Sequence, residues 1–327
     1  MSAAIMQKEP LPVLIIRLDG IGDALALAPL LAGLRERAIP VDLVLRRENA
    51  GIFSPRAARR IEIAPFALRS SSAENLRLIS DFAATLAPRN YESVLVATED
   101  PGGYRLARAI GAPERIGFDN GWGKPLKTLW VRSMLTRTLY RPAGLEARGR
   151  HECEVLFELG RSLLGDAQPT RALDALRPLL IEREPARDER VAVQVTEKWR
   201  LFGISPSDVA ALITRLARAR GVRAIASARE ASFAGSVADA GIVVERFDAL
   251  EPWKAAIAAA RALVAPDSGA LGVAGMLGTP TVALFPPQRR FERQIARWHP
   301  WAAPYRIVRL ENGWPQRALC GLEELLA

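Results

Sequence analysis

The sequence predicts an α/β protein of two Rossmann-like domains, each built on a parallel β-sheet, with a central cleft between them. At 327 residues the chain is long enough for about two domains of roughly 150 residues. Apolar strand-like runs alternate with helical stretches along its length. Two junctions of the same kind, an apolar strand followed by an aspartate and a helix, lie near Asp23 and Asp267, more than one domain apart.

The predicted strands are mostly unbroken apolar runs, which is typical of parallel strands buried on both faces. They lie at 13–18, 41–45, 93–97, 191–195, 222–227, 262–265 and 281–285.

Helical stretches separate these strands, and this alternation favours parallel sheets with crossover helices. They lie at 23–37, 72–86, 103–110, 146–164, 207–220, 251–260 and 269–277. A short final helix at 316–326 is expected to pack back on the body of the protein, with the N-terminal domain as the candidate surface.

The segment 165–190 interrupts the alternation. It contains Pro169, Pro178 and Pro185 and ends in a mixed-charge stretch, so we place the connection between the domains there. The predicted domains are residues 1–168 and 169–327.

The net charge of +9 is concentrated in the front half. Residues 1–150 contain 22 basic and 15 acidic residues, whereas the remainder contains 23 and 21. This favours an acidic partner such as a phosphorylated glycolipid or an anionic membrane surface, although an arginine-rich composition without such a partner is the alternative. Nucleic acid is not expected, because the basic residues are scattered and lack interleaved aromatic residues.

The sequence also indicates a reduced, cytoplasmic protein. Cys153 and Cys320 lie far apart and form no redox or metal motif. The apolar run from Leu11 to Ile16 is too short for a signal peptide, and no run approaches the ~20 residues that span a bilayer.

The first junction contains Gly20 and Gly22 between Asp19 and Asp23. The two glycines allow a sharp turn and close approach of a ligand. Asp23 is either an N-cap of the next helix or a carboxylate in the cleft that accepts a proton from a hydroxyl. Leu25 replaces the third glycine of the dinucleotide fingerprint, which argues against NAD binding here.

The second junction reads Asp267-Ser268-Gly269-Ala270. Amide groups at the start of the following helix could hold a diphosphate with the help of the helix dipole. Helix capping by Asp267 is the alternative.

Two cations follow the strand at 191–195. Lys198 and Arg200 are candidates for pairing with a phosphate leaving group, and solvated loop charges are the alternative.

Several catalytic designs are disfavoured by what the sequence lacks. His151 and His299 are its two histidines, and it contains no Gly-x-Ser-x-Gly elbow, no Walker A loop and no Asp-x-Asp pair. We therefore predict no metal site and no cofactor, and we interpret His151 as a structural residue.

Four stretches together resemble glycosyltransferase family 9, the ADP-heptose:lipopolysaccharide heptosyltransferases. They are the run around Asp23 at 14–29, the His-Glu-Cys-Glu sequence at 151–154, the run around Asp267 at 267–285, and Arg-Trp-His-Pro-Trp at 297–301. They occur in the expected order and cover nearly the whole chain, and the third is the most specific.

The resemblance implies a GT-B fold, with acceptor binding by the first domain and nucleotide-sugar binding by the second. It implies inverting, metal-independent transfer of a sugar, heptose first, from an ADP-linked donor to a lipopolysaccharide-type or other glycan acceptor. Asp23 would be the general base, Lys198 would meet the diphosphate, and Asp267 to Ala270 would hold the donor. The expected location is the cytoplasm, with peripheral contact at the inner face of the membrane.

Two places depart from the family pattern, and one of them is Pro286-Pro287-Gln288, where the family usually has Gly-Pro-Thr. Gly272 stands where the family commonly has histidine, next to the expected donor pocket. Two alternatives therefore stay open: a GT-B enzyme that uses another nucleotide sugar, and a non-catalytic relative that binds a glycan or a protein partner.

Overall fold

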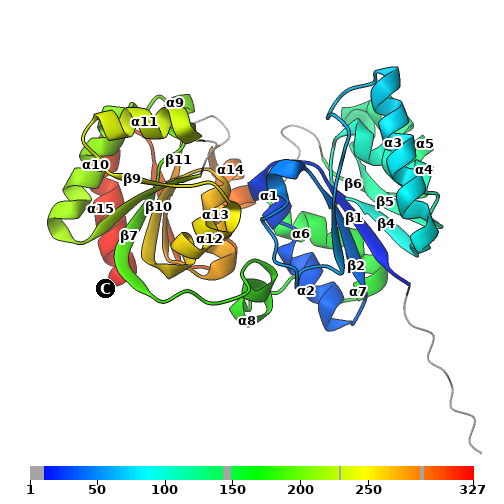
Figure 1. The fold of residues 1–327 in the computed structure, drawn as a ribbon, viewed down its shortest axis with the longest axis horizontal. Coiled ribbons are helices and arrows are strands. Elements are labelled where there is room, and N and C mark those ends of the chain that lie inside the picture. Colours follow the sequence, from blue (N-terminus) through cyan, green and yellow to red (C-terminus); the bar gives the residue numbers. More distant parts are fainter. Residues whose placement is uncertain (1–10, 143–148, 228–229, 288–290) are drawn as a thin grey trace, which may run out of the picture.

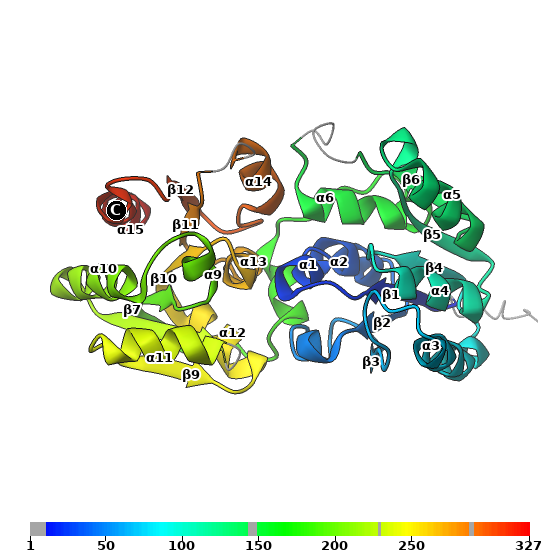
Figure 2. The ribbon, with the colours of Figure 1, turned by 90° about the horizontal axis from the view of Figure 1, so that it is seen from above.

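The chain folds into two α/β domains that lie side by side (Figure 1). The fold comes from a computed structural model that describes residues 11–142, 149–227, 230–287 and 291–327. Each domain contains a six-stranded parallel sheet with helices on both faces, as Figure 2 shows from above. The predicted α/β class with two parallel sheets is confirmed.

The first domain carries the sheet ordered β3-β2-β1-β4-β5-β6. Its strands are β1 (Val13–Arg17), β2 (Val41–Leu45), β3 (Arg60–Ile63), β4 (Ser93–Val96), β5 (Glu114–Asp119) and β6 (Arg137–Tyr140). Its helices are α1 (Ile21–Leu25), α2 (Ala28–Glu36), α3 (Ala73–Leu86), α4 (Pro101–Ile110), α5 (Pro125–Met134), α6 (Glu152–Phe157) and α7 (Arg161–Leu164).

The second domain repeats this strand order, with β12-β11-β10-β7-β8-β9. Its strands are β7 (Asp188–Gln194), β8 (Val222–Ser227), β9 (Val244–Phe247), β10 (Ala260–Pro266), β11 (Thr281–Phe285) and β12 (Tyr305–Arg309). Its helices are α9 (Lys198–Leu201), α10 (Pro206–Ala219), α11 (Ala231–Asp239), α12 (Leu250–Ala259), α13 (Gly269–Leu277), α14 (Phe291–Trp298) and α15 (Trp314–Leu326).

This strand order fixes where each domain can bind a ligand. In the first sheet, successive strands from β1 to β3 extend toward one edge and those from β4 to β6 extend toward the other, so the order reverses between β1 and β4. In the second sheet the same reversal occurs between β7 and β10. Ligands of open parallel sheets bind beyond the carboxyl ends of the strands at such a point, because the crossover helices there lie on opposite faces and leave a crevice. Both predicted junctions, after β1 and after β10, lie at these points.

Local signals in the sequence explain where the helices begin and end. At the start of α10, Ser205 and Asp208 form a reciprocal capping box, and Pro206 occupies the first helical position. At the end of α4, Gly111 adopts a left-handed conformation with φ of +74°.

Five strands were not predicted: β3, β5, β6, β9 and β12. Four of them are the outer strands of the two sheets, and their side chains are partly exposed. Edge strands need no continuous apolar run, so the apolar criterion missed them. Helices α5, α9, α11 and α14 and the short helix α8 (Leu173–Leu176) were also missed. The predicted helix at 146–164 is α6 followed by α7, and residues 146–148 lie outside the described residues.

The expectation that the final helix packs on the N-terminal domain is wrong. Helix α15 lies against β12 and β11 of the second sheet. Its buried residues Trp314, Ala318 and Leu322 share a core with Val282 and Leu284. The second sheet needs this cover, because both faces of a parallel sheet are apolar.

The two domains share one apolar core. It joins residues of α1 and α2, such as Leu25 and Leu27, to residues of α13, such as Leu271. The connecting segment, which contains the predicted boundary after residue 168, carries α8 (Leu173–Leu176) between α2 and α13. The fully buried Lys254 of α12 adds polar links, since its ammonium donates to the carbonyls of Ile52 and Leu180.

Gly275 provides a test of the close packing around α13. A Cβ atom there would lie 2.6 Å from the backbone nitrogen of Trp301 and 3.0 Å from Cα of Pro300. Gly275→Ala is expected to lower the free energy of unfolding by about 1–3 kcal/mol, because backbone atoms cannot move aside easily. Urea unfolding followed by circular dichroism measures the change.

Gly235 of α11 supplies the matched control, since a Cβ atom there would meet nothing within 4 Å. Gly235→Ala should raise stability by about 0.5–1 kcal/mol through the lower entropy of its unfolded chain. Equal effects of the two substitutions would contradict the packing argument.

Candidate active site

A cavity of about 460 Å³ lies between the domains, beyond the carboxyl ends of β1, β7 and β10. The first domain contributes Gly20 to Asp23, Leu25, Ala26, His151 and Cys153. The second contributes Gln194, Thr196, Lys198, Ser227, Glu230, Trp253, Asp267 to Ala270, Gly272, Met276, Gln294, Trp298, His299 and Trp301.

Eight of the ten predicted site residues line this cavity. They are Gly20, Gly22, Asp23, Lys198, Asp267, Ser268, Gly269 and Ala270. Arg200 does not, because its guanidinium pairs with Glu197 at 3.0 Å and lies over the ring of Phe233. Asp19 also lies outside the lining and is 3.4 Å from Arg17.

Neither aspartate of the two junctions caps a helix. Helix α1 has Gly20 at its N-cap, and Asp23 lies in its first turn. Helix α13 has Ser268 at its N-cap, and no side chain bonds to its first amides. The capping interpretation of both residues is therefore wrong, and both carboxyl groups face the cavity.

Asp23 is held by Arg17, the last residue of β1. The guanidinium lies 3.2 Å from Oδ1 of Asp23, and its Nε donates to the Asp23 carbonyl at 3.1 Å. Burial raises the pKa of the Asp23 carboxyl above its ordinary value; Arg17 opposes this shift, and Asp19 and Glu152 add to it. Asp23 is thus a more basic carboxylate than an exposed aspartate.

A buried carboxylate, Glu152 of α6, joins this site to three arginines. Arg141 donates to both of its oxygens at 2.9 Å, Arg297 of α14 donates at 2.9 Å, and Arg17 lies 3.7 Å away. Burial opposes the charge of Glu152, but Arg141, Arg17 and Arg297 together lower its pKa, so it is ionised. Because Arg297 belongs to the second domain, this cluster spans the domain interface.

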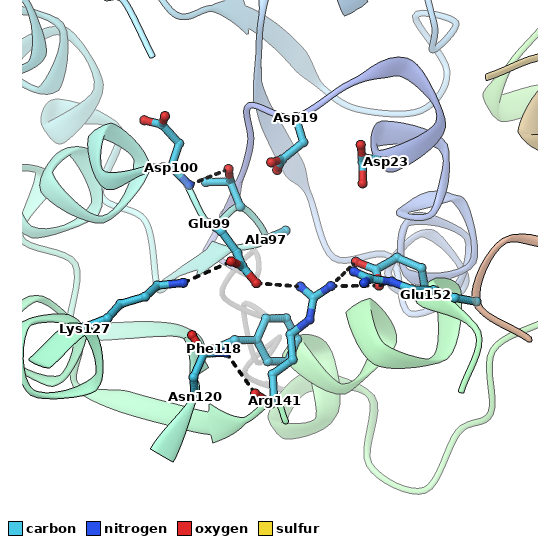
Figure 3. Close-up of polar contacts among 12 residues, drawn as sticks. Asp19, Asp23, Ala97, Glu99, Asp100, Phe118, Asn120, Lys127, Arg141 and Glu152 are labelled. Atoms are coloured by element: carbon cyan, nitrogen blue, oxygen red, sulfur yellow. Dashed lines mark hydrogen bonds and ion pairs between the residues drawn. The ribbon is translucent and has the colours of Figure 1, made fainter. Parts of the chain in front are cut away.

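The same network continues away from the cavity. Figure 3 shows Arg141 between Glu99 and Glu152, with Lys127 on the far side of Glu99. The Lys127 ammonium lies 3.1 Å from Glu99. The charges therefore alternate along the line from Lys127 to Asp23.

Asp267 faces Asp23 from the second domain. Gln294 of α14 donates to its carboxylate at 2.8 Å. Burial raises the pKa of Asp267, Gln294 and Lys198 oppose this effect, and Asp23 adds to it. Two carboxylates from two domains thus lie close enough to influence each other.

The start of α13 has the features of an anion site. The first amides of any helix lack intrahelical partners, and Gly269 and Ala270 lie here at the cavity. The hydroxyl of Ser268 is buried with no hydrogen-bond partner among the described residues. Lys198, at the start of α9, adds an exposed ammonium to the same cavity.

Glycine lets the two helix starts approach each other closely. A Cβ atom on Gly269 would lie 2.8 Å from Cγ2 of Ile21 in α1. A Cβ atom on Gly272 would lie 3.0 Å from Cδ1 of Leu25. A histidine at position 272 would therefore require the Leu25 side chain to shift, and the glycine there is consistent with this contact.

His151 is structural, as predicted. Its Nδ1 accepts from the amide of Cys153 at 3.1 Å, and its Nε2 donates to the carbonyl of His299 at 2.9 Å. Burial lowers its pKa to about 4, so the ring is neutral. The residue caps α6 and ties it to the second domain.

A second hollow of about 690 Å³ lies on the other side of Glu152. Its lining includes Arg141, Arg150, Arg293 and Arg297, together with Tyr140. Glu152 and Glu158 also line it and pair with three of these arginines, and the excess of arginine over glutamate favours an anionic ligand.

Sequence reasoning missed the residues that support the site, namely Arg17, Glu152, Arg297 and Gln294. The first three lie in the stretches at 14–29, 151–154 and 297–301, so the sequence marked these stretches but did not reveal which side chains contact each other. No local pattern marked Gln294. Among the described residues, no cluster of three or more His, Cys, Asp or Glu side chains could hold a metal ion.

The raised pKa of Asp23 predicts a pH-dependent effect on stability. Between the ordinary aspartate value of 3.8 and the raised value, the folded state binds more protons than the unfolded state, so stability falls as the pH rises. Asp23→Asn should therefore be at least as stable as the wild type at neutral pH. This advantage in stability should disappear when the pH falls below the ordinary aspartate pKa of 3.8.

Asp42 provides the opposite case. Burial opposes its charge, but hydrogen bonds from Arg59 and Tyr91 hold its pKa below the ordinary value. Asp42→Asn should therefore lose stability at neutral pH and lose less in acid. Thermal unfolding of both variants across this pH range tests the assignment, which would be wrong if both lost stability equally.

Comparison with known proteins confirms the expected fold. No protein-family profile and no curated protein matches the sequence. The structure is similar to a glycosyl transferase family 9 protein from Veillonella parvula, with 16% identity, coverage of 98% of each chain and a TM-score of 0.73. It is also similar to heptosyltransferase WaaC of E. coli with ADP (22% identity, 96% of this chain and 99% of that chain, TM-score 0.72). A third similar structure is ADP-heptose lps heptosyltransferase II of E. coli (17% identity, 96% and 98%, TM-score 0.67). Similarity at this level of identity shows that the chain has the two-domain GT-B fold of these glycosyltransferases.

Proposed function

We propose that the protein is an inverting glycosyltransferase that moves a sugar from a nucleoside-diphosphate donor to an acceptor hydroxyl without a metal ion. The observation that carries this proposal is the cavity between the domains. In it, the Asp23 carboxylate of one domain faces the start of α13 and Lys198 of the other. A base and an anion site on opposite walls are what a displacement at an anomeric carbon requires.

The second domain suits the donor. Amides at the start of α13 would accept the diphosphate, and the Lys198 ammonium would offset the charge that develops as it leaves. An ADP-linked heptose is our first choice, because the E. coli WaaC structures of this fold were solved with ADP and with ADP-2-deoxy-2-fluoro heptose.

The first domain suits the acceptor. Asp23 would take the proton from the attacking hydroxyl, and its raised pKa makes it a better base. In-line attack from the side opposite the diphosphate inverts the anomeric centre. Arg17 keeps the carboxylate in place at 3.2 Å.

An anionic glycolipid of the lipopolysaccharide type is the acceptor that the charges favour. The arginine-lined hollow lies next to Glu152, which neighbours the Arg17–Asp23 pair. Phosphate or carboxylate groups of the acceptor would bind there while the hydroxyl reaches Asp23. We place this reaction in the cytoplasm, at the inner face of the membrane.

A second candidate is an enzyme that acts on another nucleotide sugar. A UDP-N-acetylglucosamine 2-epimerase from Listeria monocytogenes, described as putative in its title, has a related fold, with a TM-score of 0.56. The same donor wall would hold its diphosphate. A non-catalytic glycan-binding or partner-binding protein would use the same cavity without needing Asp23 as a base.

Replacement of Asp23 tests the catalytic proposal. Asp23→Asn should lower kcat by about 10²–10⁴-fold, because the general base is lost, with little change in donor KM. For the wild type, the acid limb of kcat should lie above the ordinary pKa of aspartate. Transfer is measured as nucleoside diphosphate released in the presence of acceptor.

Asp81→Asn, an exposed position in α3, is the control and should keep full activity. Unchanged kcat in the Asp23→Asn variant would remove Asp23 from the mechanism.

Lys198 and Arg200 provide a matched pair on the donor side. Lys198→Ala should weaken binding of ADP by about ten- to a hundredfold, because a charge-assisted contact to the diphosphate is lost. Arg200→Ala, two residues along α9, should bind ADP like the wild type. Calorimetry with ADP, UDP, GDP and dTDP measures these affinities and separates the donor classes; equal losses in both variants would contradict the assignment.

A further inference from the structure

A group of exposed apolar side chains lies on the outer side of the first domain. Trp122 is 93% exposed, Leu126 84% and Leu129 71%, and all three come from the turn at 121–123 and from α5. With Tyr140 of β6 they line a hollow of about 940 Å³. We call these four residues the α5 patch.

The patch is not a failure of packing by α5. The inner side of this helix buries Thr128 and Val131, which attach it to the domain. Its outer side adds Leu126 and Leu129 next to Trp122. Single exposed apolar residues are common, but a contiguous group around a hollow usually marks an interaction surface.

Basic side chains outnumber acidic ones around the α5 patch. Residues 121–141 contain five basic side chains and no acidic one. They are Lys124, Lys127, Arg132, Arg137 and Arg141. Glu99, Asp119 and Glu152 pair with Lys127, Arg132 and Arg141, whereas Lys124 and Arg137 are exposed. Basic residues next to tryptophan and leucine match an anionic bilayer, where each cation contributes about 1 kcal/mol and tryptophan favours the headgroup region.

The patch also leads toward the proposed active site. Tyr140 lines both the hollow of the α5 patch and the arginine-lined hollow. The latter contains Glu152, which neighbours the Arg17–Asp23 pair. In Figure 2, α5 and β6 of the first domain and α14 of the second lie along the same edge of the molecule.

We propose that the α5 patch is a membrane-docking surface that seats the first domain on a bilayer of anionic lipids. Trp122, Leu126 and Leu129 would enter the interface between headgroups and acyl chains, and the exposed Lys124 and Arg137 would meet lipid phosphates. The arginine-lined hollow then lies near the bilayer, where a glycolipid headgroup can enter it. This last step rests on the proposed function, whereas the docking does not.

A second copy of this chain is the competing occupant. In a twofold contact the same surface meets itself, so the exposed Lys124 and Arg137 of the two copies would be brought together. Like charges at such short range oppose the contact, whereas anionic lipid neutralises them. The charge pattern therefore favours a membrane.

Vesicle sedimentation with the full chain tests the proposal. The wild type should bind vesicles of phosphatidylcholine mixed with phosphatidylglycerol, bind phosphatidylcholine vesicles weakly, and be released by salt. Leu126→Glu should lower binding about tenfold or more, since the leucine that would enter the bilayer is lost and a carboxylate is introduced. Val243→Glu is the matched control, because Val243 is 88% exposed but lies in the second domain, and it should bind like the wild type.

A fluorescence measurement locates the contact. The emission of the wild type should shift to the blue when anionic vesicles are added, and Trp122→Phe should keep binding but lose most of the shift. Equal binding by the Leu126→Glu and Val243→Glu variants would overturn the proposal. The proposal would also be overturned if the wild type did not bind vesicles but formed a dimer in sedimentation velocity, and if the Leu126→Glu substitution dissociated that dimer. Neither assay needs donor or acceptor, so failure of the proposed transferase activity would be seen separately.

Discussion

A buried carboxylate, Glu152, organises the space between the domains. It receives Arg141 from the end of the first sheet, Arg17 from β1 and Arg297 from the second domain. Removing any one partner would leave charge that is buried and poorly compensated, which is strongly unfavourable. The cluster therefore fixes Arg17, and through Arg17 it fixes the carboxylate of Asp23.

The site is built where the fold provides free backbone groups and open space. In both sheets the strand order reverses at the strand that leads to the site aspartate, Asp23 in the first domain and Asp267 in the second. Each reversal leaves a crevice at the sheet edge, and the two crevices face each other across the cavity. Glycines at 269 and 272 let the helices that follow these strands approach closely. The same burial that closes the cavity raises the pKa of both aspartates, which makes their carboxylates more basic at the expense of stability.

Charge gives the two sides of the molecule different tasks in this proposal. On the donor side, one lysine and the start of a helix offer positive charge to a diphosphate. On the acceptor side, arginines line a separate hollow, and the apolar α5 patch lies beyond it. The alternating ion pairs from Lys127 through Glu99, Arg141 and Glu152 connect these regions.

The sequence by itself determined the α/β class, seven of the eight inner strands and both aspartate junctions, because buried parallel strands and glycine-rich turns leave local patterns. The outer strands, such as β6 and β9, left no such pattern, because one side of an edge strand is only partly covered. Only the tertiary structure decided which charges meet: Glu152 and Arg297 are 145 residues apart in sequence and 2.9 Å apart in space. It also separated Lys198 from Arg200, since successive side chains of one helical turn point in different directions and only Lys198 faces the cavity.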